Sequence, residues 1–574
     1  MNLSPPRNHQ NGVEPDGPPL SRPGRGRLDG WMDRTVFSIC PLCEATCGLQ
    51  LTVDGDRITG VRGDGDDPLS RGYLCPKGAA FGQLDADPDR VSGPRVRRGD
   101  ALIPVSWDEA FIAVHEGLTR VIEAHGRDAV AMYLGNPNVH TLAGGLFAGP
   151  LRKSLGSPNI FTASTVDQMP KHVSCGYLFG HPMAIPVPDV DRTDFLLILG
   201  ADPYTSNGSL WTVPDLPARL TELRRRGGRL VVVDPRRTRT ARAADLHLPI
   251  RPGADVYLLL GMVHELFARN LVALGRLAPH VSGVEDARDL VMAYPPEVVG
   301  PWCGVDAGAI RELAAELAAA GRAAVYGRIG TTTVPHGTVT SWLVDVLNVL
   351  TGNLDRPGGM MFPLPAHGHR GKGTGPGFAT GRWRSRVRGL PEVFGELPAV
   401  TLADEMLTPG PGQVRALITV AANPVLSAPG GARLAAALDR LDFMVSLDIY
   451  CNETTRHADV ILPGLSALED SHYDVAFPQF SFRNHARYSG PVFEPTVPPE
   501  WQTLLRLAAI AKGLGAQADV LALDDEWLAD EVRKQVGAEG APQVLQTLGK
   551  RKGPERLVDL ALRNGLFIVP RFVK

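Results

Sequence analysis

The stretch RLVVVDPRRTRTARAADLHLPIRPGADVYLLLG, residues 229–261, contains the clearest structural unit in the chain. Its apolar run stops at Asp234-Pro235, which is typical of a buried β-strand followed by a turn. Asp255 then stands where a helix could begin. In parallel sheets, ligands bind where such strands end. The stretch therefore predicts a strand, a turn and a helix, with polar side chains placed to meet a ligand.

Four further short apolar runs repeat this pattern. Each ends at Gly, Asp or Asn-Pro, and helical stretches lie between many of them; the runs are DFLLILG (194–200), AAVYGRIG (323–330), VRALITVAANP (414–424) and DFMVSLDIY (442–450). One helix is especially clear, because Ser106 and Glu109 form a capping box ahead of helical apolar spacing. Alternating strands and helices of these lengths predict an α/β fold with two doubly wound parallel sheets.

The composition is ordinary for a globular protein with several domains. The 574 residues include 44% hydrophobic and 21% charged residues, and the formal net charge is -3. This length predicts about three or four domains, and the lack of a basic excess argues against nucleic acid as a partner. Residues 1–35 are rich in Pro, Gly, Arg and Asp, so we expect a disordered tail. Neither a signal peptide nor a membrane span is found, so the expected location is cytoplasmic.

Four of the seven cysteines lie close together near the N-terminus. Cys40, Cys43 and Cys47 fall within CPLCEATC, and Cys75 follows in GYLCPKG after 27 intervening residues. Asp54-Gly55 predicts a β-hairpin between them, which would bring Cys75 back to the first three. Zinc sites usually pair two short knuckles, and disulfides are rare in reducing compartments. The spacing therefore favours an iron–sulfur cluster, with zinc and disulfides as alternatives.

The stretch CPLCEATCGLQLTVDGDRITGVRGD, together with GYLCPKG, resembles the N-terminal signature of the molybdopterin oxidoreductase family. This family includes formate dehydrogenases, nitrate reductases and dimethyl sulfoxide reductase, and the resemblance extends from about residue 36 to about residue 475. It implies a 4Fe-4S cluster on the four cysteines and a bis-molybdopterin guanine dinucleotide that carries molybdenum or tungsten. It also implies that Lys77, next to Cys75 in CPKG, lies between cluster and pterin and stabilises the reduced cluster.

The resemblance assigns further residues to the cofactor. For one nucleotide it implies Asp234, Arg236, Thr238, Gly253 and Asp255, of which Asp255 would accept two hydrogen bonds from guanine. For the pseudo-symmetric second nucleotide it implies Asn423, Pro424, Asp448, Thr454 and Thr455. Gly352 and Asn353 of NVLTGNLDRPGG would approach a pterin. The sequence departs from the family at Asp202, where Asn is usual, which predicts repulsion of a phosphate.

The family usually offers the metal one protein ligand, from a loop after a Gly-x-x-Asn turn. The corresponding loop is GSPNIFTASTVDQMPKHVSCG, and counting from Asn159 as in the formate dehydrogenases places Asp167 at the ligand position. An Asp oxygen suits a high-valent metal. Ser164, Cys175 or no protein ligand are the alternatives, and Asp167 could instead cap a helix. Gln168 stands where the formate enzymes carry His, which disfavours formate as the substrate.

The expected architecture is a small β-rich iron–sulfur lobe plus two doubly wound α/β domains related by pseudo-symmetry. After the tail, the expected parts are the lobe (36–100), a discontinuous α/β domain (101–160 with 345–470), a second α/β domain (161–344) and a helical extension (471–574). The family normally continues with a β-barrel over the nucleotides, and the sequence shows no strand-rich segment for it. A separate chain is therefore a candidate partner that could supply the barrel.

The predicted function is that of a molybdenum- or tungsten-dependent oxidoreductase. It would pass electrons between a bis-pterin metal centre and the cluster, act on a small-molecule substrate and exchange electrons with a redox partner protein. The alternative is a non-catalytic iron–sulfur electron-transfer subunit that resembles the large subunit of complex I.

Overall fold

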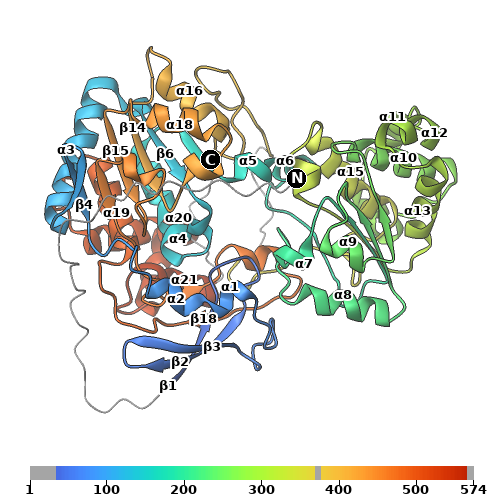
Figure 1. The fold of residues 1–574 in the computed structure, drawn as a ribbon, viewed down its shortest axis with the longest axis horizontal. Coiled ribbons are helices and arrows are strands. Elements are labelled where there is room, and N and C mark those ends of the chain that lie inside the picture. The colour runs from blue at the N-terminus through green and yellow to red at the C-terminus, as the bar shows by residue number, and fades with distance from the viewer. Residues whose placement is uncertain (1–33, 369–376, 565–574) are drawn as a thin grey trace, which may run out of the picture.

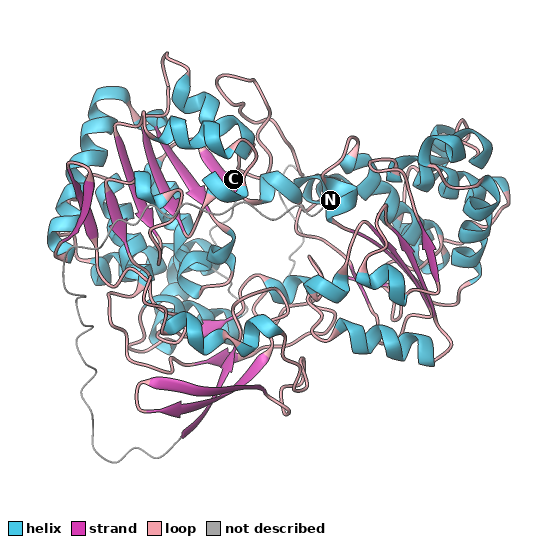
Figure 2. Ribbon diagram, in the orientation of Figure 1, coloured by secondary structure: helices cyan, strands magenta, loops and turns pink. Residues whose placement is uncertain are grey.

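The computed structural model describes residues 34–368 and 377–564. Figure 1 shows a small β lobe at the bottom, one α/β domain at the left and a second at the right. Strands form the interior of each α/β domain and helices cover them (Figure 2). The predicted fold class, a β lobe with two doubly wound α/β domains, is confirmed. The predicted disordered tail lies outside the described residues, apart from Arg34 and Thr35.

The small β lobe is an antiparallel sheet in the order β1-β2-β3. Leu49, Leu51 and Val53 of the central strand are buried, as their alternation with polar residues predicts. The hairpin turn contains Gly55, whose φ of 59° glycine adopts without strain. The elements are β1 (Arg34–Ile39), β2 (Gly48–Asp54), β3 (Arg57–Gly63), α1 (Pro76–Ala79) and α2 (Phe81–Asp85).

The first α/β domain is built on a seven-stranded sheet in the order β5-β4-β16-β15-β14-β6-β7. The strands from β16 to β7 are parallel, and both faces are covered. Met132 packs with α3 and α4 on one face, whereas Tyr133 packs with α16 and α18 on the other. The elements are β4 (Arg95–Arg98), β5 (Ala101–Pro104), α3 (Trp107–His125), β6 (Val130–Leu134), α4 (Leu142–Leu155), β7 (Ile160–Thr162), α16 (Leu402–Leu407), β14 (Ala416–Val420), α17 (Pro424–Ser427), α18 (Gly431–Leu438), β15 (Phe443–Leu447) and β16 (Val460–Leu462).

The second α/β domain is built on a parallel four-stranded sheet in the order β11-β10-β9-β12. Leu197 packs with α10, α13 and α15, and Ile198 packs with α8 and Trp211 on the opposite face. The elements are α5 (Ser164–Asp167), α6 (Met169–Phe179), β8 (Val187–Pro188), β9 (Phe195–Leu199), α7 (Pro203–Ser206), α8 (Leu216–Arg225), β10 (Arg229–Val233), α9 (Arg239–Ala243), β11 (Leu246–Leu248), α10 (Asp255–Ala268), α11 (Val284–Val291), α12 (Pro296–Cys303), α13 (Ala307–Ala319), β12 (Ala323–Gly327), α14 (Ile329–Thr332), α15 (Gly337–Leu350) and β13 (Met360–Met361).

The two α/β domains correspond strand by strand. The order β6-β14-β15-β16 in one matches β12-β9-β10-β11 in the other. Asp202 precedes α7 with φ -121° and ψ 71°, and Asn423 precedes α17 with φ -123° and ψ 64°. Thr240 Oγ1 donates to Asp202 Oδ1 at 2.6 Å, just as Thr454 Oγ1 donates to Asn423 Oδ1 at 2.8 Å. The pseudo-symmetry therefore extends to single side chains, and Asp202 takes the structural place of the usual Asn.

A helical region follows the second half of the first sheet. Trp501, Leu504 and Leu507 of α19 join the apolar core that α3 and α4 form on that sheet. In the part of the chain that the structure describes, no helix has both the length and the apolar content that a membrane crossing requires. The elements are β17 (His472–Tyr473), β18 (Tyr488–Ser489), α19 (Glu500–Ala511), α20 (Val520–Thr547) and α21 (Gly553–Asn564).

Candidate functional site

The four N-terminal cysteines meet at the turn between β1 and β2. The N–H of Cys40 donates to the carbonyl of Cys47 at 2.8 Å and closes the turn. Burial raises the pKa of the Cys40 thiol to about 12, and the neighbouring Cys43 and Cys75 raise it further. Burial raises the pKa of Cys43 and Cys47 as well, and Cys75 acts on both. All four thiols therefore lie within electrostatic range of one another, as the hairpin predicts.

Four neighbouring thiols can hold an iron–sulfur cluster or a single metal ion. A tetrahedral zinc site needs its sulfur ligands close together, whereas a cubane spreads four sulfur ligands around a larger core. Among the described residues, no group of three or more His, Cys, Asp or Glu side chains forms a single-ion site. None of the seven cysteines, all of which the structure describes, is paired in a disulfide. Bound iron would stabilise thiolates that burial alone disfavours.

Lys77 lies between the cysteines and the first α/β domain. Its side chain is exposed on α1, and its charge acts to lower the pKa of Cys40 and Cys43. Burial lowers the pKa of His140 to about 4, and the Lys77 charge adds to this shift. The His140 ring lies 4.6 Å from the Phe477 ring, measured between centroids. The Lys77 charge therefore acts on the cysteines and on His140 of the first α/β domain, and its place between cluster and pterin stays a prediction.

Asp167 ends α5, beside a buried arginine that the sequence did not single out. Arg328 follows β12, and its Nη2 lies 3.9 Å from Asp167 Oδ2. Nη2 also donates to Gln168 Oε1 at 3.3 Å. Burial raises the pKa of Asp167, and the Arg328 charge opposes this. The carboxylate, a third exposed, is available as a metal ligand, and that role stays a prediction.

Glu44 brings the cysteine turn to the same place. Its Oε2 accepts the N–H of Leu210, in the second α/β domain, at 2.6 Å. Burial raises its pKa to about 7, Arg328 opposes this, and Asp167 adds to it. The cluster lobe, the loop after β7 and the loop after β12 therefore converge on one polar centre. Sequence analysis missed Glu44 and Arg328, because neither stands in a motif with its partners.

The alternative metal ligands are less well placed. Cys175 is fully buried in α6, within the apolar core of the second sheet, and its Sγ donates to Asp345 Oδ2 at 3.9 Å. Ser164 Oγ accepts a hydrogen bond from Gln168 Nε2 at 3.0 Å. No side chain caps the first turn of α6, so the helix-cap role considered for Asp167 is wrong.

The first predicted nucleotide site lies at the carboxyl edge of the second sheet. Asp234 follows β10, and the three arginines after it, Arg236, Arg237 and Arg239, are exposed. Asp255 is the first residue of α10; burial raises its pKa to about 6, and Asp234 adds to this. A pocket of about 440 Å³ opens beside Gly253, lined also by Arg251, Pro252, Ala254, Tyr257 and Trp302. This edge therefore combines basic, acidic and aromatic groups suited to a nucleotide.

One member of this set, Thr238, also has a structural role. Thr238 is buried, and its Oγ1 accepts the N–H of Ala241 at 3.1 Å, which caps α9. The cap holds the arginine-bearing loop in place. Direct contact between Thr238 and a nucleotide stays a prediction.

The second predicted nucleotide site lies at the matching edge of the first sheet. Asn423 and Pro424 begin α17, and Asp448 follows β15 with a half-buried carboxylate whose pKa burial raises. Thr454 and Thr455 are fully buried. Thr454 Oγ1 bonds to Asn423 and to the N–H of Val425, and Thr455 Oγ1 bonds to the backbone of Tyr450 and Asn452. Both threonines shape the loops, and their direct contact with a nucleotide stays a prediction.

Gly352 and Asn353 do not lie where the resemblance places them. Asn353 Oδ1 accepts the N–H of Ala323, the first residue of β12, at 3.0 Å. This is the amino end of the sheet, opposite the edge that carries Asp234 and Arg328. Asn353 is also 1% exposed. The loop therefore closes the amino end of the second sheet, away from the edge that carries Asp234 and Arg328, and its contact with a pterin stays a prediction without support from this position.

Two buried histidines in the segment that contacts the cysteine lobe have ring nitrogens without a hydrogen-bond partner in the described structure. In the described part of the chain, Nε2 of His472 and both ring nitrogens of His485 are buried without a hydrogen-bond partner. Burial lowers the pKa of both histidines to about 3, so both rings are neutral, each with one N–H donor and one acceptor. Buried polar atoms normally have partners. The residues present thus fit a pterin, which carries its own donors and acceptors.

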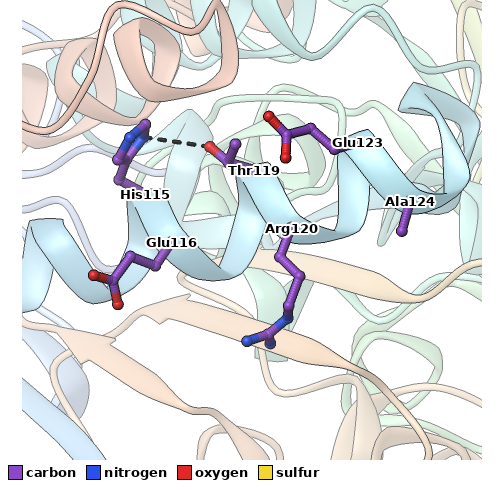
Figure 3. Close-up of a pocket in the computed structure, with 6 residues that line it drawn as sticks. All are labelled: His115, Glu116, Thr119, Arg120, Glu123 and Ala124. Carbon is purple, nitrogen blue, oxygen red and sulfur yellow. Dashed lines mark hydrogen bonds between the residues drawn. The ribbon is translucent and has the colours of Figure 1, made fainter.

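The pocket in Figure 3 lies elsewhere, on the outer surface of α3. It measures about 570 Å³, and all its lining residues belong to that one helix. His115 Nδ1 and Thr119 Oγ1 share a hydrogen bond of 3.3 Å there. None of the predicted site residues contributes to it, so it is a feature of the helix surface.

The fold, the four N-terminal cysteines and the loops at the strand ends all match one family of proteins. A family model described as molybdopterin oxidoreductase matches residues 90–492, and a model of the molybdopterin oxidoreductase Fe4S4 domain matches residues 33–84. The chain belongs to the molybdopterin oxidoreductase family. Its four N-terminal cysteines therefore belong to an iron–sulfur domain, and the zinc and disulfide alternatives are wrong. Members of the family use bis-molybdopterin guanine dinucleotide with molybdenum or tungsten, as predicted.

Individual relatives differ in the reactions that their names describe. Formate dehydrogenase H of Escherichia coli is 28% identical over 454 residues, which are 75% of this chain and 62% of that protein. The assimilatory nitrate reductase catalytic subunit of Bacillus subtilis is 25% identical over 461 residues, 76% of this chain and 63% of that protein. The structure of acetylene hydratase from Pelobacter acetylenicus has a TM-score of 0.70 at 20% identity, covering 85% of this chain and 71% of that chain, and so shares the fold. The chain spans slightly under two thirds of the length of these two curated relatives.

Proposed function

We propose that the protein is a molybdenum- or tungsten-dependent oxidoreductase that passes electrons between a bis-pterin metal centre and the 4Fe-4S cluster. One observation carries the proposal: Glu44, from the cysteine turn, accepts the N–H of Leu210 beside Arg328 and Asp167. The turn that holds the cluster thus touches the loops where the metal would be bound. Electron transfer between the two centres requires this proximity.

The residues of the chain have separate tasks in this proposal. When bound, the pterin-held metal supplies two-electron chemistry on the substrate. Asp167 offers a carboxylate oxygen as a metal ligand. Lys77 holds a positive charge between the cysteines and the first α/β domain, where it stabilises added negative charge on the cluster. Arg236 and Asp255 hold the phosphates and the guanine of the first nucleotide.

The test is metal and nucleotide analysis of protein purified without air. We expect about four iron atoms per chain, together with molybdenum or tungsten, and guanine nucleotide released on denaturation. The Cys75→Ser variant should lose most of the iron. Iron without either metal and without nucleotide would contradict the proposal and support the alternative of a non-catalytic electron-transfer subunit.

Partners and location follow from the same proposal. A small-molecule substrate and a redox partner protein are required for turnover, since electrons must enter and leave. The cytoplasmic location and a separate chain that supplies a barrel domain stay predictions. Gln168 donates to Ser164 and accepts from Arg328, and so occupies the position after Asp167 with a group that does not titrate as His does. This supports the prediction that formate is disfavoured.

A further inference from the structure

We propose that Arg328 binds the anionic group of the substrate, a carboxylate or a small oxyanion, through the free nitrogen of its guanidinium. The inference rests on the proposed function, because it places the substrate beside Asp167 and the metal. The substrate class is then that of small anions, and Arg328 is a binding residue that the resemblance does not assign.

Arg328 is held rigidly at the carboxyl end of β12. Its side chain is 5% exposed. Nε donates to Ser209 Oγ at 2.8 Å, and Nη2 donates to Gln168 Oε1 at 3.3 Å. These two bonds come from different segments and fix the plane of the guanidinium. The group is therefore preorganised before any ligand arrives.

The remaining nitrogen of Arg328 has no partner. Nη1 is buried, and within residues 34–368 and 377–564 nothing accepts a hydrogen bond from its two N–H groups. A buried charged donor left unpaired is costly, and native structures seldom keep one without a reason. A guanidinium edge matches the geometry of carboxylates and oxyanions. A bound anion would therefore supply the missing acceptor.

The neighbouring charged groups do not form a close ion pair with Arg328, so its positive charge is available to a ligand. Asp167 lies at 3.9 Å, beyond hydrogen-bond distance, and as a metal ligand it would share its charge with the metal. Glu44 acts on Arg328 electrostatically, but its Oε2 accepts from Leu210. The nearby Lys171 is neutralised by Asp345, whose carboxylate oxygens lie 2.7 and 2.8 Å from Nζ.

An anion at Nη1 could come from the substrate or from a phosphate of the cofactor. The two sources predict different losses when Arg328 is changed. A substrate contact would leave the bound pterin and nucleotide intact, whereas a cofactor contact would release them.

The experiment uses the intact holoprotein and three variants. Arg328→Gln removes the charge and the fork, and Arg328→Lys keeps the charge alone. Arg322→Gln is the matched control, because Arg322 lies at the opposite end of the same strand, is exposed and pairs with Asp194. Each protein is titrated with formate, nitrate, thiosulfate and the neutral compound dimethyl sulfoxide, and binding is followed by the paramagnetic resonance signal of the metal.

We expect the wild type to bind at least one of the three anions. Arg328→Gln should weaken that binding about 10- to 100-fold, Arg328→Lys should weaken it less, and Arg322→Gln should leave it unchanged. Iron, metal and nucleotide contents should equal those of the wild type in all three variants.

Three outcomes would overturn the inference. The first is equal anion binding by Arg328→Gln and the wild type. The second is a metal-loaded wild type that binds none of the three anions. The third is loss of nucleotide from both Arg328 variants, which would assign Arg328 to the cofactor. A wild type that lacks molybdenum and tungsten would instead refute the proposed function, and this inference with it.

Discussion

At the scale of single residues, we expect the charge of Lys77 to tune the potential of the cluster. The ammonium group lies within electrostatic range of Cys40, Cys43 and His140. We expect Lys77→Gln to lower the midpoint potential of the cluster by roughly tens of millivolts, since the reduced cluster loses a favourable charge. A redox titration followed by paramagnetic resonance measures this shift. Lys77→Arg should keep most of the potential, and an unshifted Lys77→Gln variant would refute the role.

Glu396 makes the free energy of unfolding depend on pH. Thr162 Oγ1 donates to Glu396 Oε2 at 2.6 Å, and burial raises the pKa of this carboxyl from 4.5 to about 7. Between these values the folded protein holds one proton more than the unfolded chain, so the free energy of unfolding falls as pH rises through this window. Above about pH 7 this contribution is constant.

The Glu396→Gln variant should remove that dependence. Its stability relative to the wild type should rise by up to about 1.4 kcal/mol per pH unit across the window, since the amide cannot ionise. Urea denaturation at a series of pH values measures the difference. A difference that does not change with pH would show that Glu396 titrates normally.

At the scale of elements, α6 is tied to α15 by a buried ion pair. Lys171 Nζ lies 2.7 Å from Asp345 Oδ2, and both side chains are almost wholly buried. The pair fixes the helix that follows Asp167 and Gln168. It therefore positions the candidate metal ligand although it does not touch it.

Breaking this pair on one side should be severe. We expect Lys171→Met to lower the free energy of unfolding by about 3–5 kcal/mol, because Asp345 is left as an unpaired buried charge. The double variant Lys171→Met with Asp345→Leu should recover most of that loss. Arg433→Met, which removes an exposed partner of Asp404, should cost about 1 kcal/mol or less in the same urea titration. Equal losses in the single and double variants would contradict this account.

Sequence patterns located the strand ends well but not the loop after α15. The runs that end at Asp234, Asn423 and Asp448 end at carboxyl edges of the sheets, because residues that directly follow a strand in the chain lie at its carboxyl end. Gly352 and Asn353 follow a helix instead. A helix that follows a strand of a parallel sheet runs back along it, so the loop after the helix lies at the amino end, and here it lies at the amino end of β12.

At the scale of the whole molecule, the segment around β17 and β18 joins the three parts, and Tyr473 of β17 packs in the core of the first α/β domain. Arg487 donates to Asp67 at 2.9 and 3.1 Å and to Thr46, within the cysteine turn, at 2.6 Å. Arg483 of the same segment donates to Asp189 and Asp191 of the second α/β domain, each at 2.8 Å. The cysteine turn is therefore held by residues more than 400 positions away.

Arg487→Met should loosen the cysteine turn selectively. We expect faster amide hydrogen exchange over residues 40–47 and partial loss of iron, because three hydrogen bonds to the lobe disappear. Arg483→Met is the matched control and should leave the exchange of this turn unchanged. If amide hydrogen exchange over residues 40–47 is as slow in both variants as in the wild type, Arg487 does not anchor the cluster lobe.

The sequence alone determined the cysteine turn with its hairpin, the strands of both sheets and the pseudo-symmetric loops after them. These features are local: side-chain periodicity, turn residues and short spacings act over a few residues, so they can be read without knowing the rest of the chain. Only the tertiary structure decided that Glu44, Asp167 and Arg328 meet, that Arg328 keeps an unpaired nitrogen there, and that Asn353 lies at the opposite end. Those facts depend on how three separately encoded parts pack together, and no short stretch of sequence specifies that packing.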